Sequence, residues 1–495
     1  MSDLEAAYIG LDVGTTGVRG LLVREEGSVA SVEESHHDTV LQKVGWAEQD
    51  PDDWAKGSLS VLTRLARTAH DMGLHVEALG LTGQMHGATF VGLDDKPVRP
   101  AIIWMDQRSI AEADELQARL EQSGLETRSL NRSLPNMTAS KVLWLERHEP
   151  EHRRVLRTLL LPKDYVRLVL TGEKATDVSD ASGTLLLDIG QRVWSGELAG
   201  LVGLTLDQLP RVAESNAITG RILRSVADAT GLPPDTPVVA GAGDQAAGAI
   251  GVGVRAVGDV MISLGTSGVV FGAVATPPRP RNPSLHAFCH AVDNTWHWMG
   301  VTQAAGGSLK WLRQTMLPGL SYSELDRRAS DVAPGSEGLF FLPYLMGERA
   351  PILDPEARGA LAGITARHGI GHLARAVMEG VAYSLRSVLD AAQADFRTDG
   401  SVRITGGGAT SPLWRSILSA VLDRQLETVS SPQGAAFGAA LLAAEGTSNR
   451  PDPSGTWIQV HSDRPPDRTW IREYRTGMSR YLALYPALQP LTRPE

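Results

Sequence analysis

Two short glycine–threonine turns, each joining a pair of apolar β-like segments, most constrain how this chain can fold. The first covers residues 12–17 (DVGTTG) and the second covers residues 264–268 (LGTSG). The backbone N–H groups of such a turn can bind phosphate oxygens, and the threonine hydroxyls add neutral donors. A single turn of this kind most often serves only to reverse the chain. Because the unit occurs twice, the sequence predicts two related domains that face each other and hold nucleotide phosphates from both sides.

Size and composition narrow the classes of protein to which the chain can belong. At 495 residues it is too long for one hydrophobic core. Asp and Glu outnumber Lys and Arg by 57 to 47, which argues against a broad nucleic-acid surface. The single cysteine, Cys289, excludes an intrachain disulfide and fits a reducing compartment. With neither a membrane-spanning apolar stretch nor a signal-peptide pattern, we expect a cytoplasmic protein without nucleic-acid or membrane partners.

Strand-like segments alternate with helix-like segments along the chain, and this alternation predicts an α/β fold. The strand–turn–strand pattern of the N-terminus restarts after a buried strand at residues 238–243. We therefore expect a first domain over residues 1–245 and a second over residues 246–445, with a hinge near residues 245–258. A proline-rich loop and a terminal helix, residues 446–495, are expected to pack back on the domains.

Local signals predict several individual elements. A helix is expected to begin at Asp50 and Pro51, because Asp is a good N-cap and Pro fits the first helical turn. The other expectations are strands at 76–81, 101–104 and 402–405, a helix that begins with the segment 159–165 and is closed by residues 171–172, a polar turn cluster at 176–183, a proline-rich loop at 451–466 and a helix at 472–484.

Two aspartates are candidates for chemistry. Asp244 lies just past a buried strand and at the start of a helix, the place where α/β proteins bind ligands. It could act as a general base or simply cap the helix. Asp12, beside the first turn, suits a water-mediated Mg²⁺ contact, although an Asp at this position can equally serve the turn.

Two groups of histidines have less certain roles. Met85 and His86 lie in a short loop after a buried strand, a usual position for ligand contacts, but a lone histidine there is more often structural. His286, Cys289, His290 and His297 suggest a metal site only by composition. Their spacing matches no standard zinc pattern, and the segment alternates like a strand.

Several motifs together resemble the FGGY carbohydrate kinases of the actin-like ATPase superfamily, and within them the bacterial xylulokinases. The likeness spans nearly the whole chain, and its most specific piece is GQMHGAT at residues 83–89. The other matching segments are 8–16 (YIGLDVGTT), 46–51 (WAEQDP), 161–165 (LPKDY), 179–184 (SDASGT) and 341–349 (FLPYLMGER).

The resemblance implies two actin-like (ribonuclease H-like) ATPase domains with a cleft between them, and transfer of phosphate from ATP, with Mg²⁺, to O5 of D-xylulose. It implies that Asp244 is the catalytic base. The residues implied to contact the sugar are Met85, His86, Trp104, Asp106 and Asp244. Those implied to bind the nucleotide are Thr15, Thr16, Gly265, Thr266, Gly307, Gly407, Gly408 and Ser411, and Asp12 is the implied metal contact.

Two departures from the family pattern leave the exact sugar open. Gln245 stands where the family usually has Asn after the catalytic Asp, and Met105 stands where it usually has Asn after Trp104. One alternative is therefore a kinase for another pentulose or a polyol. An alternative of a different class is an actin-like nucleotide switch that binds a protein partner. The oligomeric state is undecided, with a homodimer as the candidate assembly.

Overall fold

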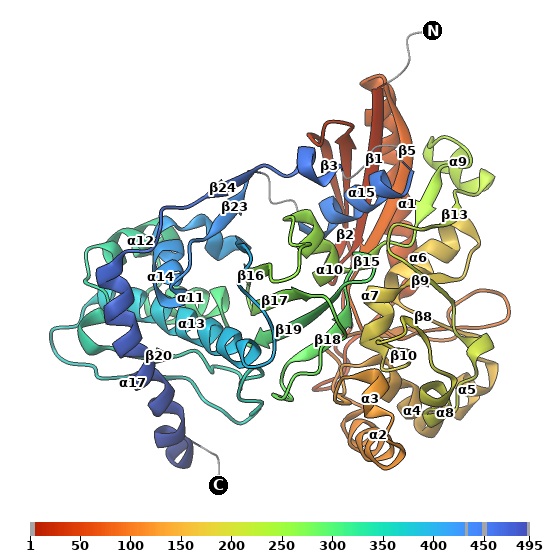
Figure 1. Ribbon diagram of the computed structural model, residues 1–495. Helices are drawn as coiled ribbons and strands as arrows, with labels where there is room; N and C mark the ends of the chain where they lie inside the picture. Colours follow the sequence, from red (N-terminus) through yellow and green to blue (C-terminus); the bar gives the residue numbers. More distant parts are fainter. Residues whose placement is uncertain (1–4, 431–433, 448–452, 493–495) are drawn as a thin grey trace.

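The computed structural model describes residues 5–430, 434–447 and 453–492. Two seven-stranded mixed sheets form the centres of two bodies, and helix α10 (Asp244–Gly251) lies between them (Figure 1). The strands of the first sheet, in the order β13-β14-β5-β1-β2-β3 with β15 beside β5, are β1 (Glu5–Val13), β2 (Gly17–Arg24), β3 (Val29–His36), β5 (Leu74–Gly83), β13 (Ile218–Arg221), β14 (Pro237–Val239) and β15 (Ala242–Gly243). Those of the second, in the order β18-β19-β17-β16-β22-β23-β24, are β16 (Val260–Leu264), β17 (Gly268–Val274), β18 (His286–Cys289), β19 (Trp296–Thr302), β22 (Val402–Thr405), β23 (Glu427–Val429) and β24 (Val460–Ser462).

Helices cover both sheets, and shorter elements fill the connections. The longer helices are α1 (Pro51–Asp71), α2 (Ile110–Ser123), α4 (Thr138–His148), α6 (Pro162–Thr171), α12 (Tyr322–Ser330), α13 (Ile370–Gln393), α14 (Pro412–Leu422), α15 (Gly434–Thr447) and α17 (Arg468–Thr492). The shorter helices are α3 (Glu126–Ser129), α5 (Pro150–Val155), α7 (Val178–Ala181), α8 (Gly196–Leu201), α9 (Arg224–Thr230), α11 (Gly306–Trp311) and α16 (Ser454–Trp457). The strands outside the two large sheets are β4 (Glu48–Gln49), β6 (Thr89–Val91), β7 (Ala101–Ile102), β8 (Thr158–Leu160), β9 (Ala175–Asp177), β10 (Leu187–Asp188), β11 (Val193–Trp194), β12 (Arg211–Ala213), β20 (Phe340–Leu342) and β21 (Ala360–Ala362).

The predicted doubling of the strand–turn–strand unit is confirmed by the pairing of the strands. In the first sheet, β1 pairs antiparallel with β2 across the first turn and parallel with β5 on its other side. In the second sheet, β16 pairs antiparallel with β17 across the second turn and parallel with β22. The two sheets therefore repeat one local topology, and each presents its glycine–threonine turn at the end of its first strand.

Helix α1 begins where the sequence predicts. The Asp50 side chain accepts a hydrogen bond from the backbone N–H of Asp52 at 3.0 Å, and Pro51 occupies the first helical position. Residues at helical spacing on one face of α1, among them Trp54, Val61 and Leu62, are fully buried in the core of the first sheet.

Helices α10 and α15 pack on each other and on the first sheet, although α15 comes late in the chain (Figure 1). Two glycines make this close approach possible. A Cβ on Gly10 would lie 1.8 Å from the carbonyl oxygen of Ala436, and one on Gly80 would lie 1.9 Å from that of Ala439. Helix α15 therefore ties the sequence that follows the second sheet to the strands that carry the first turn.

Two local predictions are wrong. Residues 176–183 do not form a turn cluster but the end of β9, helix α7 and the start of a 3₁₀ turn. The Asp177 carboxylate accepts from the N–H groups of Ser179 and Asp180, so the polar residues that suggested a turn cap a helix instead. The predicted loop at 451–466 contains α16 and strand β24, and residues 451–452 lie outside the described part.

The terminal helix α17 is longer than the predicted 472–484. Its residues Tyr474 and Tyr481 are buried in the core of the second body, where they contact Tyr383 of α13. Within the described residues, no helix is both long and apolar enough to cross a bilayer.

Candidate active site

The first glycine–threonine turn is held by hydrogen bonds within the turn and with two neighbouring side chains. The N–H of Gly14 donates to the carbonyl of Gly17 at 3.0 Å and closes the turn. The Thr15 hydroxyl accepts from the indole N–H of Trp104 at 2.9 Å and lies 3.4 Å from the side-chain oxygen of Gln84. Trp104 remains 37% exposed, so part of its side chain borders solvent.

The second turn is bonded to the start of α11. The carbonyl of Thr266 accepts from the N–H groups of Ala305 and Gly307, both at 2.9 Å, and that of Gly265 accepts from Gly306 at 2.8 Å. A Cβ on Gly307 would lie 2.8 Å from the Thr266 oxygen, so glycine is needed for this approach. The turn and the beginning of α11 thus form one rigid unit.

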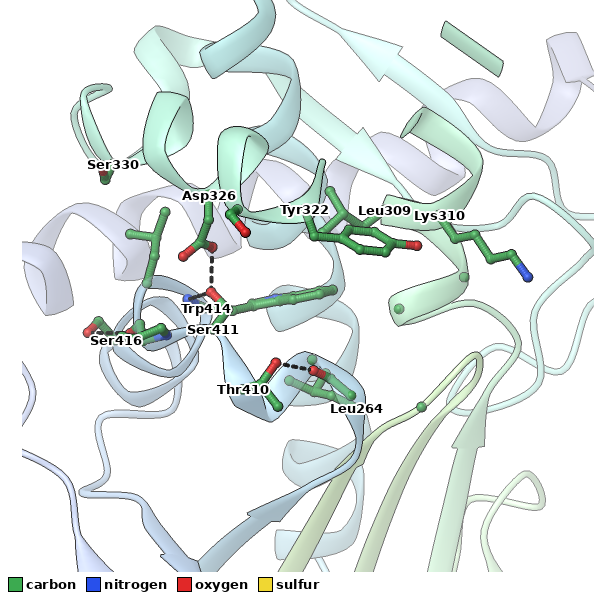
Figure 2. A pocket seen from close by; sticks show the side chains of 18 of the residues that line it. Leu264, Leu309, Lys310, Tyr322, Asp326, Ser330, Thr410, Ser411, Trp414 and Ser416 are labelled. Atoms are coloured by element: carbon green, nitrogen blue, oxygen red, sulfur yellow. Dashed lines mark hydrogen bonds between the residues drawn. The ribbon is translucent and has the colours of Figure 1, made fainter. Parts of the chain in front are cut away.

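A pocket of about 1090 Å³ opens beside this unit (Figure 2). Its lining includes every second-domain residue predicted to bind nucleotide, namely Gly265, Thr266, Gly307, Gly407, Gly408 and Ser411. Thr15 and Thr16 of the first turn are not part of this lining. The structure therefore brings six residues from three distant segments to one cavity.

Sequence reasoning missed the wall that α12 contributes to the pocket. Figure 2 shows Tyr322 and Asp326 of α12 on one side of the pocket and Ser411 and Trp414 on the other. The Ser411 hydroxyl donates to the Asp326 carboxylate and accepts from the N–H of Trp414, so it both caps α14 and joins the two walls. No motif marks α12, and only the packing of that helix reveals its part in the pocket.

Asp12 and Asp244 lie at the same edge of the first sheet. Strands β1 and β15 flank β5, and both Asp12 and Ala242 pair with Thr82. Burial raises the pKa of Asp12 to about 7, with the charge of Asp244 as the second cause. Burial also raises the pKa of Asp244 to about 6. Gly243, not Asp244, is the N-cap of α10, so the carboxylate of Asp244 does not serve as the helix cap.

The surroundings of Asp12 fit a divalent cation. Its Oδ1 atom is buried without a hydrogen-bond partner, and a second carboxylate lies close enough to raise its pKa. A cation held there through water would supply the missing positive charge. Among the described residues no group of three or more His, Cys, Asp or Glu could hold a metal, so the remaining ligands would be water and nucleotide oxygens.

The histidine and cysteine group of the second sheet has structural contacts instead. His290 lies 3.0 Å from the carbonyl of Val254, His297 stacks on Phe271, and the Cys289 thiol is buried against Ile189. These residues belong to β18 and β19 and the loop between them, in agreement with the expected strand alternation.

His86 is fixed in one tautomer and one backbone conformation. Its Nδ1 lies 2.8 Å from the carbonyl of Gly183, so the neutral ring donates there and leaves Nε2 as an acceptor. Burial lowers the pKa of His86 to about 3, which keeps the ring neutral. The backbone at φ 65° is held by two donors to its carbonyl, Lys141 Nζ at 2.7 Å and the Thr138 hydroxyl at 3.1 Å.

Met85 connects the loop after β5 with both Asp244 and the second sheet. A Cβ on Gly243, the residue before Asp244, would lie 3.0 Å from Met85 Cγ. The Met85 side chain also packs with Phe288 of β18 and Met299 of β19. The sugar loop predicted from the sequence therefore lies beside the predicted base and against the other body.

Asp106 is placed differently from the other predicted sugar contacts. It is fully buried, and its oxygens accept from the Arg108 guanidinium and from the N–H of Ala47. The Arg108 guanidinium lies 3.8 Å from the ring centre of Trp46 and also binds Glu48. In this structure Asp106 is paired with Arg108 and Ala47, and its contact with a sugar stays a prediction.

A buried ionic cluster behind Asp244 was not anticipated. Lys163 Nζ lies 2.6 Å from Asp164, 2.9 Å from Asp177 and 3.4 Å from Asp180, all fully buried. Burial raises the pKa of Asp180 well above its usual value, and the charge of Asp244 adds to this effect. The cluster joins α6 to α7, and a Cβ on Gly243, the residue before Asp244, would lie 3.5 Å from Cα of Asp180.

Comparison with known proteins identifies this arrangement. Residues 7–251 match the N-terminal domain of the FGGY family of carbohydrate kinases, and residues 260–446 match its C-terminal domain. The chain belongs to the FGGY family. It is therefore an ATP-dependent sugar kinase that uses a divalent metal ion, and its two sheets are the actin-like domains that the sequence motifs implied.

Individual relatives of this FGGY kinase match over nearly the full length. It is 39% identical over 492 residues to the xylulose kinase of Escherichia coli strain K12, covering 98% of this chain and 99% of that protein. It is 33% identical to the xylulose kinase of Bacillus subtilis strain 168, covering 96% of each. The crystal structure of a "xyloylose kinase" from Brucella ovis superposes with a TM-score of 0.91 at 37% identity, covering 98% of this chain and all of that one.

Proposed function

We propose that this FGGY kinase transfers the γ-phosphate of ATP to O5 of D-xylulose, giving D-xylulose 5-phosphate. The names of its full-length relatives support the sugar. The observation that carries the proposal is the adjacency of the Met85–His86 loop to Asp244, with Gly243 packed directly on Met85. A nucleotide switch has no need of a neutral, tautomerically fixed histidine in a loop beside a carboxylate of raised pKa.

In the proposed mechanism Asp244 accepts the proton of O5 as this oxygen attacks the γ-phosphorus in line. With its pKa raised to about 6, Asp244 is mostly ionised at neutral pH and yet more basic than an ordinary aspartate. Nε2 of His86 accepts a hydrogen bond from a sugar hydroxyl, and the Met85 side chain packs against the carbon chain.

The nucleotide part of the proposal uses both turns. The adenosine occupies the pocket between α12 and α14, and the Thr266 turn directs the phosphates toward the Thr15–Thr16 turn of the other domain. Thr15, Thr16 and Thr266 then donate to oxygens of the transferring group. A Mg²⁺ ion held through water by Asp12 supplies positive charge at the β- and γ-phosphates when bound.

A panel of sugars tests the proposal directly. ADP release is measured with pentuloses, hexuloses, polyols and aldonates, and the product is analysed by NMR for the position of the phosphate. D-Xylulose should give the highest kcat/KM, with phosphate on O5. Preference for another pentulose or a polyol would transfer the proposal to that sugar. ATP hydrolysis unaffected by any sugar would favour the nucleotide switch instead.

A further inference from the structure

Two glutamine side chains that the proposed mechanism does not use connect the first glycine–threonine turn to the Met85–His86 loop. Gln49 belongs to β4, and Gln84 directly follows β5 and precedes Met85. Both side chains are buried, with exposed fractions of 1% and 2%. An amide carries donors on its nitrogen and an acceptor on its oxygen, so its orientation decides what each neighbouring group must do. The hydrogen bonds of this pair allow only one orientation of each amide.

The orientation of Gln49 follows from two partners of fixed polarity. The indole N–H of Trp54 can only donate, and it lies 3.0 Å from Gln49 Oε1. The carbonyl of Thr15 can only accept, and it lies 2.7 Å from Gln49 Nε2. The oxygen of this amide is therefore turned toward Trp54 and its nitrogen toward the turn, where it holds the backbone at Thr15.

The orientation of Gln84 follows from that of Gln49. Because Gln49 Oε1 accepts, the atom of Gln84 that lies 2.8 Å from it is the amide nitrogen. The same nitrogen lies 3.5 Å from the carbonyl of Gly14, which also can only accept. Gln84 Oε1 is thereby left to face the Thr15 hydroxyl, at 3.4 Å. The backbone of Gln84 is fixed as well, since its N–H donates to the carbonyl of Val13 at 3.0 Å.

These contacts make the Thr15 hydroxyl a donor. The indole N–H of Trp104 donates to the hydroxyl oxygen at 2.9 Å, so the hydroxyl hydrogen must point elsewhere. Within the described residues, the acceptor that this hydrogen meets is Gln84 Oε1, and 3.4 Å is long for a bond between two oxygens. A phosphate oxygen at the turn would therefore be a better acceptor for the same hydrogen.

We propose that Gln84, oriented by Gln49, is a positioning residue that holds the Thr15 hydroxyl as a donor to the γ-phosphate. This inference rests on the proposed function, since it takes Thr15 to meet the phosphate and Met85 to meet the sugar. Because Gln84 directly precedes Met85, it fixes the donor relative to the loop that meets the sugar. A displacement of about 1 Å between reacting groups can cost about 10² in rate, so this link bears on kcat.

A double-mutant cycle of Gln84→Met with Thr15→Val tests this role. Gln84→Met nearly keeps the length of the side chain but removes the amide. It should lower kcat about 10- to 100-fold while KM for ATP and for the sugar each change less than about threefold, as for a contact made only in the transition state. In the Thr15→Val background the same substitution should lower kcat less than about threefold, because the hydroxyl that the amide holds is absent.

Gln208→Met is the matched control in the same domain. The Gln208 amide also bonds in both directions, as donor to the carbonyl of Leu156 at 3.2 Å and as acceptor from the N–H of Thr205 at 3.3 Å. This variant should leave kcat and both KM values unchanged. Thermal unfolding of all variants shows whether a loss of kcat accompanies a loss of the fold.

The outcomes separate this inference from the proposed function. Equal losses of kcat with and without the Thr15 hydroxyl, an unchanged kcat in either single variant, or a rise in KM instead of a fall in kcat would overturn the role of Gln84 and leave the sugar kinase activity intact. The cycle uses the sugar with the highest kcat/KM, so preference for a sugar other than D-xylulose overturns the proposed function alone. If Gln84→Met does not fold, Gln49→Met enters the same cycle, and additive losses there overturn the proposal.

Discussion

Replacing Asp244 by Asn should abolish most activity and at the same time make the protein more stable at neutral pH. The carboxylate is partly buried, and burial raises its pKa from 3.8 to about 6. An aspartate in the unfolded chain keeps its ordinary pKa, so the folded state binds the proton more tightly. Ionisation of Asp244 therefore destabilises the fold as the pH rises from about 4 to about 6, and the destabilisation persists at higher pH.

The size of this effect follows from the shift. A rise of roughly two pKa units corresponds to about 3 kcal/mol, since one unit is worth about 1.4 kcal/mol. Asn keeps the shape and an acceptor oxygen but carries no charge. Above pH 7, Asp244→Asn should raise Tm by a few degrees, whereas near pH 4 the two proteins should melt alike. The variant should lose about 10² to 10⁴ in kcat, the usual contribution of a general base.

Thermal unfolding at pH 4, 5, 6, 7 and 8 measures the stability difference, and a coupled ADP-release assay measures kcat. Asp235→Asn, at an exposed aspartate remote from the site, is the matched control and should show neither effect. The unsubstituted enzyme should lose activity as the pH falls through about 6. A variant that melts below the parent protein at pH 8, or one that keeps kcat within tenfold, would refute the reasoning.

Three further predictions concern binding, motion and packing. His86→Ala should raise KM for D-xylulose by one to two orders of magnitude, about 1.5–3 kcal/mol, because a buried acceptor is lost; an unchanged KM argues against sugar contact. Small-angle scattering should show a smaller radius of gyration with D-xylulose and a non-hydrolysable ATP analogue, since the two turns must close on one nucleotide; equal radii argue against a hinge at residues 245–258. Gly80→Ala should lower the free energy of unfolding in urea by more than about 2 kcal/mol, because its Cβ would lie 1.9 Å from the Ala439 oxygen, while Gly200→Ala in open space should not.

Much of the site could be predicted because its signals are local in the sequence. The glycine–threonine turns, the N-cap at Asp50 and the strands before Met85 and Asp244 depend on neighbouring residues, and the structure contains each of them. The turn predicted for residues 176–183 was wrong because polar residues are common both in turns and at helix starts. In each place an aspartate side chain can accept hydrogen bonds from nearby N–H groups, as Asp177 does here.

Other properties were decided only by tertiary packing. Nothing near Tyr322 or Asp326 in the sequence marks them as pocket residues, and they reach the pocket because α12 packs on α13. The tautomer of His86 depends on a carbonyl at Gly183, far along the chain, and its neutral state depends on burial. The raised pKa of Asp12 depends on burial and on Asp244, which parallel pairing with β5 brings to the same edge. A sequence specifies which groups are present, but their desolvation and their distant partners exist only after folding, and these determine the charge that each group carries.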